Sequence, residues 1–187
     1  MQERLHILKI LKKVDRAIHK KDFIELRTLS NKFIHHASIH QDPDVISTAV
    51  IIYALSKMIE REDYKKERNW NYFYRDYCDN IGDMVVALQN RDTEGFREEV
   101  HENRKFIEKL SGNLKIFIGD VFRGARINKA SRIYEHGISM ESTAKILGIT
   151  VWELAEYAGK TGIGDVNLGV TMTLKDRVKL AGEIFKK

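Results

Sequence analysis

A single proline, Pro43, occurs in the 187 residues of this chain, and apolar residues recur three or four positions apart over long stretches. Proline interrupts regular structure because it lacks a backbone N–H, and apolar residues with this spacing share one face of an α-helix. Hydrophobic residues make up 43% of the chain and charged residues 32%, which is typical of a soluble globular protein. The sequence therefore predicts an all-α fold.

Each expected helix carries an apolar stripe that a neighbouring helix must cover. The clearest helix start is Asp42-Pro43-Asp44, where Asp42 can accept from free backbone amides and Pro43 suits the first turn. Asp22 and Asp92 can cap two further helices in the same way. Before residue 136 we expect helices at about 3–20, from 22, at 43–62 and 64–90, from 92, and at 114–135.

The clearest break in this series is Ser111-Gly112-Asn113, because glycine ends helices well and asparagine can begin the next one. We therefore predict an N-terminal helical bundle at residues 1–111, which serves dimerisation or sensing, and a C-terminal helix-turn-helix domain at residues 112–187. Within the second domain we expect a glycine-rich loop at 159–169, a short strand near Val170 and a last helix from Thr173 to Phe185.

Residues 138–157 have the residue pattern of a helix-turn-helix. Ala144 allows the helices to pack closely, Gly148 suits a turn with positive φ, and Ile149 fills the angle between the helices. Leu147, Leu154 and Tyr157 are expected in the shared core.

The run from Gly137 to Leu154 reads Gly-Ile-Ser-x-x-x-x-Ala-x-x-Leu-Gly-Ile-Thr-x-Trp-Glu-Leu. It resembles the helix-turn-helix of small prokaryotic antitoxin-like and repressor-like proteins, over about residues 138–163. The resemblance implies a repressor or antitoxin role, in which the protein binds an operator and in some cases a toxin. The long N-terminal bundle departs from the pattern of those short proteins.

DNA binding is the leading hypothesis, because residues near the start of the second helix of this motif usually meet base edges. Thr150 could contact a base or a phosphate, and Val151 a thymine methyl group. The net charge is +5, and residues 112–187 hold most of it, with 12 basic against 8 acidic residues, whereas residues 1–111 have 20 against 19. A basic C-terminal half would attract phosphate.

The expected phosphate contacts lie on the helix before the motif and beside it. They are Arg123, Arg126, Lys129, Arg132, Lys145 and Lys160. The same residues could equally form a solvated charged face. Because one weakly basic unit supplies few phosphate contacts, we expect a homodimer on double-stranded DNA, acting as a transcriptional regulator.

A protein–protein interaction module without DNA binding is the alternative. Its surface would be formed by Trp152, Val151 and the two glutamates Glu153 and Glu156, and Trp152 is expected to be an internal or interface anchor. A protein partner is compatible with either hypothesis.

An RNA-cleaving or metal-dependent helical enzyme is the third hypothesis. Arg97 and His101 are one helical turn apart, and His36 and His40 could place two imidazoles on one face as weak zinc candidates. No catalytic residue is assigned, and no cofactor is expected, since Gly162-Ile163-Gly164 is too short for a phosphate-binding loop.

Cellular location is inferred from cysteine content and from the absence of long apolar runs. The single Cys78 excludes an intramolecular disulfide, and the longest apolar run, Thr48 to Leu55, is far shorter than the ~20 residues of a membrane span. The N-terminal residues mix charges with apolar residues, unlike a signal peptide. We expect a cytoplasmic protein without a membrane partner.

Overall fold

The computed structural model describes residues 4–40, 42–61 and 63–162, and within these ranges it is all-helical. The fold class predicted from the sequence is therefore confirmed for this part of the chain. The α-helices are α1 (Arg4–His19), α2 (Phe23–His40), α3 (Pro43–Glu60), α4 (Trp70–Gln89), α5 (Thr93–Glu108), α6 (Gly112–Glu135), α7 (Met140–Leu147) and α8 (Val151–Thr161), and a 3-10 helix, η1, spans Asp63–Lys66.

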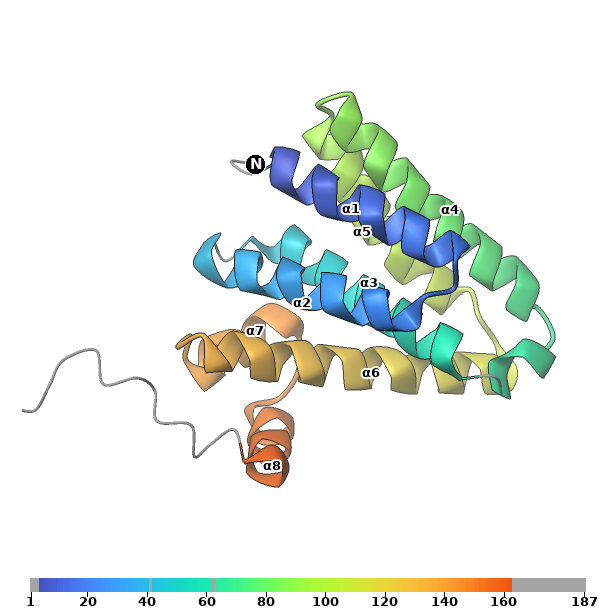
Figure 1. Cartoon of the computed structure of the whole chain (residues 1–187). Coiled ribbons are helices and arrows are strands. Elements are labelled where there is room, and N and C mark those ends of the chain that lie inside the picture. Colours follow the sequence, from blue (N-terminus) through green and yellow to red (C-terminus); the bar gives the residue numbers. More distant parts are fainter. Residues whose placement is uncertain (1–3, 41, 62, 163–187) are drawn as a thin grey trace, which may run out of the picture.

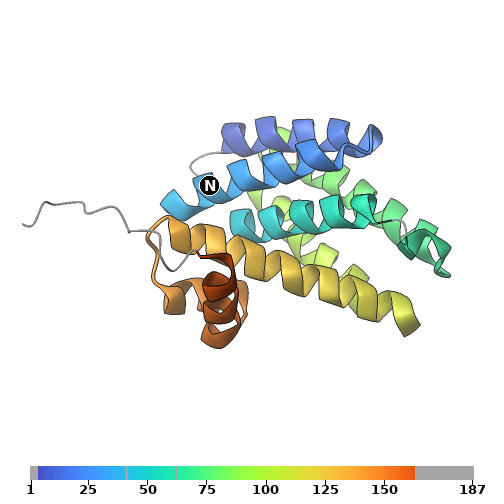
Figure 2. The same cartoon turned by 60° about the horizontal axis from the view of Figure 1, so that its bottom comes forward.

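Consecutive helices pair as hairpins and stack in layers (Figures 1 and 2). Helix α1 packs against α4 and α2, and α4 packs against α5. The α2–α3 pair lies in the middle, with α6 on its far side. Short α7 and α8 both pack beside the C-terminal part of α6, away from α1 and α4 (Figure 1).

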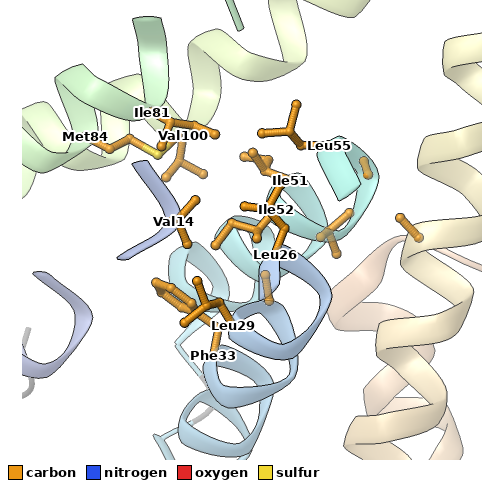
Figure 3. Close-up of a cluster of buried hydrophobic side chains, with 14 of the residues drawn as sticks. Val14, Leu26, Leu29, Phe33, Ile51, Ile52, Leu55, Ile81, Met84 and Val100 are labelled. Carbon is orange, nitrogen blue, oxygen red and sulfur yellow. The ribbon is translucent and has the colours of Figure 1, made fainter. Parts of the chain in front are cut away.

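The core is centred on α3, which is buried on much of its circumference. Val14 of α1, Leu26 of α2 and Met84 of α4 converge with Ile52 of α3 and Val100 of α5 (Figure 3). Some hydroxyl groups that enter this core donate to backbone carbonyls: Tyr77 Oη donates to the Ile51 carbonyl at 2.8 Å and Ser30 Oγ to the Ala49 carbonyl at 2.7 Å. Burial of apolar surface from five helices therefore holds the bundle together.

Three helix starts agree with the sequence prediction in atomic detail. The Asp22 carboxylate accepts from the backbone N–H of Glu25 at 2.9 Å, before α2. The Asp42 carboxylate accepts from the backbone N–H of Asp44 at 3.0 Å, and Pro43 occupies the first position of α3. The Asp92 carboxylate accepts from the Gly95 N–H at 2.8 Å. Helix α4, in contrast, begins at Trp70 rather than near residue 64, because Asn69 takes a left-handed φ of 72° after η1.

The hydrophobic cluster crosses the boundary predicted at residue 111. Helix α6 contributes Leu114, Ile118 and Ile133 to the same buried cluster as the bundle, and it packs against α2 and α3. Leu147 of α7 and Leu154 of α8 also join that cluster. The bundle and the C-terminal helices therefore share one continuous core.

The predicted strand near Val170 and the predicted last helix from Thr173 to Phe185 lie outside the described residues, as does the loop at 159–169 beyond Gly162. Within the described residues, no helix combines the length and the apolar composition that crossing a membrane requires.

Candidate functional site

Helices α7 and α8 are joined by a short turn whose backbone is fully hydrogen bonded at the end of α7. Gly148 has φ 61° and ψ 41°, a left-handed conformation that glycine adopts without a steric penalty. The Gly148 N–H donates to the Lys145 carbonyl at 3.3 Å, and the Ile149 N–H donates to the Ala144 carbonyl at 3.1 Å. This pair of bonds is the Schellman motif, and it fixes the direction in which the chain leaves α7.

Helix α8 begins with a capping box. Thr150 Oγ1 accepts from the Glu153 N–H at 3.1 Å, and Glu153 Oε2 accepts from the Thr150 N–H at 2.9 Å. Two backbone donors that a helix start leaves unpaired are thereby satisfied. The sequence prediction placed Thr150 against DNA, and the structure shows that its hydroxyl is already part of this cap.

An ion pair connects the start of α8 to α6. Arg123 Nη2 lies 2.7 Å from Glu153 Oε1, and Arg123 Nε donates to the same oxygen at 2.9 Å. The Thr150 backbone N–H, and then the Arg123 guanidinium and the Thr150 hydroxyl, lower the pKa of Glu153 to about 2. Glu153 is therefore ionised at neutral pH, and its charge is compensated by Arg123.

Arg126 forms a second link between α6 and the turn. Its Nη1 donates to the Gly148 carbonyl at 3.3 Å, so the guanidinium is bound to the backbone of the turn. Together, Arg123 and Arg126 attach the turn and the start of α8 to α6.

Lys129 is a correction to the sequence prediction, which placed it among the phosphate contacts. Its side chain is fully buried, and Nζ donates to Asn31 Oδ1 at 2.7 Å and lies 4.1 Å from the centre of the Tyr53 ring. Burial, followed by the nearby charges of Arg132 and Arg27, lowers the pKa of Lys129 to about 7. A side chain in this position cannot reach a phosphate group.

The remaining expected phosphate contacts are exposed side chains. Arg132 pairs with Glu135 at 3.0 Å, Lys160 pairs with Glu156 at 2.5 Å, and Lys145 lies exposed on α7. These ion pairs are on the surface, where such pairs contribute little to stability and exchange readily with solvent.

Two large apolar side chains are exposed at the start of α8. Trp152 has 84% of its surface exposed and Val151 has 41%. An internal position for Trp152, one of the two interpretations made from the sequence, is therefore wrong. The first turn of α8 instead presents an indole ring to the surroundings.

Some of the residues considered for an enzyme have defined partners in the described part of the chain. Arg97 is held by Asp44 at 3.0 Å and by Glu94 at 3.3 Å. Burial raises the pKa of the Cys78 thiol to about 11, which keeps it protonated at neutral pH. The side chains of His36 and His40 lie outside the described part of the chain, and among the side chains that are described no three potential metal ligands lie together.

Sequence reasoning missed a cleft between α3, α5, α6 and α7, whose lining includes His101, Asn103 and Arg126. Arg126 is far from His101 and Asn103 along the chain, and no local spacing links it to them. The signal that Lys129 turns inward was present, because Ala125, Lys129 and Ile133 are four positions apart and share one helical face.

Comparison with models of protein families, with curated protein sequences and with solved structures finds no match to this chain.

Proposed function

We propose that the chain is a DNA-binding regulator in which α7 and α8 act as a helix-turn-helix, with the first turn of α8 directed into the major groove. The observation that carries the proposal is the combination of two short helices, a turn from Gly148 to Thr150 and an exposed α8 start, all held against α6. In helix-turn-helix proteins the second helix meets the bases through its N-terminal residues.

The charges around α8 are compatible with a phosphate backbone. Glu153 and Glu156, which would otherwise repel DNA, are each paired with a basic side chain, Arg123 and Lys160. Surface ion pairs are weakly held, so each basic group can contact a phosphate while it stays beside its glutamate. With Lys129 excluded, the proposed phosphate contacts are Arg123, Arg126, Arg132, Lys145 and Lys160.

Base contacts would come from the exposed apolar side chains of α8. Val151 suits a thymine methyl group, while the hydroxyl of Thr150 is engaged in the cap. Five phosphate contacts from one copy give weak binding, and a homodimer would double them. The resemblance to antitoxin-like repressors supports a role in transcriptional repression.

The test is a salt titration of the full chain on random-sequence duplex DNA, followed by fluorescence anisotropy. Each phosphate contact contributes about −0.9 to the slope of log affinity against log salt, so the five contacts should give a slope of about −4.5 for one copy and about −9 for a homodimer. Arg132→Gln/Lys160→Gln should reduce the slope by about 2 per copy. No binding at low salt, or a slope near zero, would overturn the proposal.

A matched control also removes two positive charges, but from a part of the surface away from α7 and α8. Lys13→Gln/Lys20→Gln changes two exposed lysines at the α1 end of the bundle, on the opposite side from α8 (Figure 1). This variant should retain the wild-type slope. An equal loss of slope in both double variants would show that the binding responds to net charge alone and not to the α7–α8 surface.

A protein-interaction module is the second candidate, and the 84% exposure of Trp152 favours it specifically. Exposed tryptophan is typical of the centre of a protein interface. If the salt titration shows no DNA binding, the Trp152→Ala variant tests the interaction module directly. Loss of self-association or of partner capture by Trp152→Ala, with wild-type folding, would then support the interaction module.

A further inference from the structure

A cleft of about 710 Å³ separates α5 from the C-terminal helices, and it is lined by residues of α3, α5, α6 and α7. Its apolar wall includes Ile51, Phe122 and Ile146, and this volume falls within the range of small-molecule sites. Helix α7 forms one side, so the cleft lies directly behind the turn that leads into α8.

One buried polar group in the cleft has an unused acceptor. Asn103 is 1% exposed, and its Nδ2 donates to Asn80 Oδ1, which leaves Asn103 Oδ1 with no hydrogen-bond partner in the described residues. Asn80 in turn donates to the Glu99 carboxylate at 2.6 Å. This chain of bonds fixes the Asn103 amide at the wall of the cleft.

The charged lining of the cleft is mainly positive. Lys115, Arg126 and Lys145 line it, against one carboxylate, Glu108, with His101 beside them. Arg126 uses one nitrogen for the Gly148 carbonyl, and its buried Nε has no partner among the described groups. The Arg126 guanidinium therefore has further N–H groups that can donate to an anion.

We propose that this cleft binds a small organic anion. Its carboxylate, phosphate or sulfonate group lies against Arg126 and Lys145, and its apolar body contacts Ile51 and Phe122. The cleft shares Arg126 and Lys145 with the proposed phosphate contacts, whereas the outer face of α8 is formed by other side chains. Probe binding measured without DNA therefore tests this inference separately from the proposed function.

The test compares two fluorescent probes with the same class of apolar body. 8-Anilinonaphthalene-1-sulfonate carries an anionic group, whereas N-phenyl-1-naphthylamine is uncharged. The first should bind the full chain with a stoichiometry of one and about tenfold more tightly than the second. Lys145→Gln and Arg126→Gln/Lys145→Gln should weaken the sulfonate probe, the double variant by about tenfold, and leave the uncharged probe within about twofold.

Two glycines of α6 provide a matched pair that locates the binding. A Cβ added at Gly119 meets no atom within 4 Å, and Gly119 lines the cleft, so Gly119→Phe should fill it and abolish binding of both probes. Gly124 has the same free space, but it is not part of the lining, so Gly124→Phe should bind both probes normally. The Trp152→Ala variant should also bind both probes normally. That result would show that the probes do not bind at the exposed indole.

Thermal unfolding by circular dichroism verifies that each variant is folded. The proposal is overturned if the wild-type chain binds neither probe, if both probes bind equally, or if the sulfonate probe binds Gly119→Phe as tightly as Gly124→Phe. It is also overturned if folded Lys145→Gln and the double variant both retain wild-type affinity for the sulfonate.

Discussion

The Nζ atom of Lys129 lies 4.1 Å from the centre of the Tyr53 ring, in the interior between α6 and α3. Its hydrogen-bond acceptor, Asn31 Oδ1, belongs to α2. A cation at this position gains attraction from the ring face but loses most of its hydration. The low pKa of Lys129, about 7, reflects that loss.

Lys129→Met should stabilise the protein at pH 7 or leave its stability unchanged. An apolar residue of similar volume removes the desolvated charge, and the exposed Asn31 can bond to water instead. Urea unfolding should give a free energy of unfolding at least equal to that of the wild type. A loss of more than about 1 kcal/mol would contradict this expectation.

The advantage of Lys129→Met should shrink as the pH rises from 7 to 9. The pKa of Lys129 lies near 7 in the folded chain, against an ordinary value of 10.5. The unfolded chain therefore binds more protons in this window, so wild-type stability rises with pH, by up to about 1.4 kcal/mol per unit. Urea unfolding of both proteins at pH 7, 8 and 9 measures the difference, and parallel curves would contradict the burial of the amine.

Gly148→Ala should destabilise the protein by about 1 kcal/mol or slightly more. The cost comes from the backbone, because φ is 61° at this position and the nearest side-chain atom to an added Cβ, Arg126 Nη1, is 3.9 Å away. Gly159→Ala is the control, since Gly159 lies in α8 without a positive φ and with free space. It should stabilise the protein by up to about 1 kcal/mol. Equal effects of the two substitutions in chemical unfolding would exclude the conformational explanation.

The pKa of Glu153 should rise in Arg123→Gln but stay below its ordinary value. The Thr150 backbone N–H is the largest cause of the low pKa, and this substitution leaves it in place. Because the pKa is lower in the folded chain, the contribution of Glu153 to stability is complete above its unfolded value of about 4.5 and is lost as the pH falls toward 2. An NMR titration of the Glu153 carboxyl carbon measures both variants, and an unchanged midpoint would show that the ion pair does not form.

The two tryptophans should differ sharply when replaced by alanine. Trp152 is 84% exposed, so Trp152→Ala should change the free energy of unfolding by less than about 0.5 kcal/mol. Trp70 is 5% exposed and stacks on Tyr74 at 5.4 Å between ring centres, so Trp70→Ala should cost about 3 kcal/mol or more. Chemical unfolding provides both values, and a large loss in Trp152→Ala would mean that its ring packs against the protein.

Local signals in the sequence predicted most of the helices. Contacts between residues far apart in the chain were not predicted. Asp42 and Asp92 cap helices as expected, because a cap depends on residues within one turn. The start of α4 was misplaced because neither glycine nor proline marks the left-handed residue Asn69. The spacing of four basic residues of α6 by three predicts one basic side, whereas Lys129 is buried because it shares a helical face with Ala125 and Ile133.

The cleft could not be predicted from the sequence at all. Ile51, Asn103, Phe122 and Lys145 meet only through the packing of four helices, and none of them has a distinctive neighbour in the chain. The exposure of Trp152 likewise depends on how α8 sits against α6, which spacing alone does not determine.

The Schellman bonds before Ile149 and the capping box at Thr150 lock both sides of the turn, so α7 and α8 have little freedom to change their mutual angle. The pair can then move relative to α6 as a unit, about the link at Gly137, whose φ is 87° and whose N–H donates to the Tyr134 carbonyl at 2.9 Å. Asn128 Nδ2 of α6 also donates to Tyr157 Oη of α8 at 3.2 Å. Arg123 and Arg126 hold the α7–α8 pair in place, because each connects α6 to a residue that follows Gly137 in the chain. An anion that drew Arg126 away from Gly148 would break one of these two contacts and leave the angle between α7 and α8 unchanged.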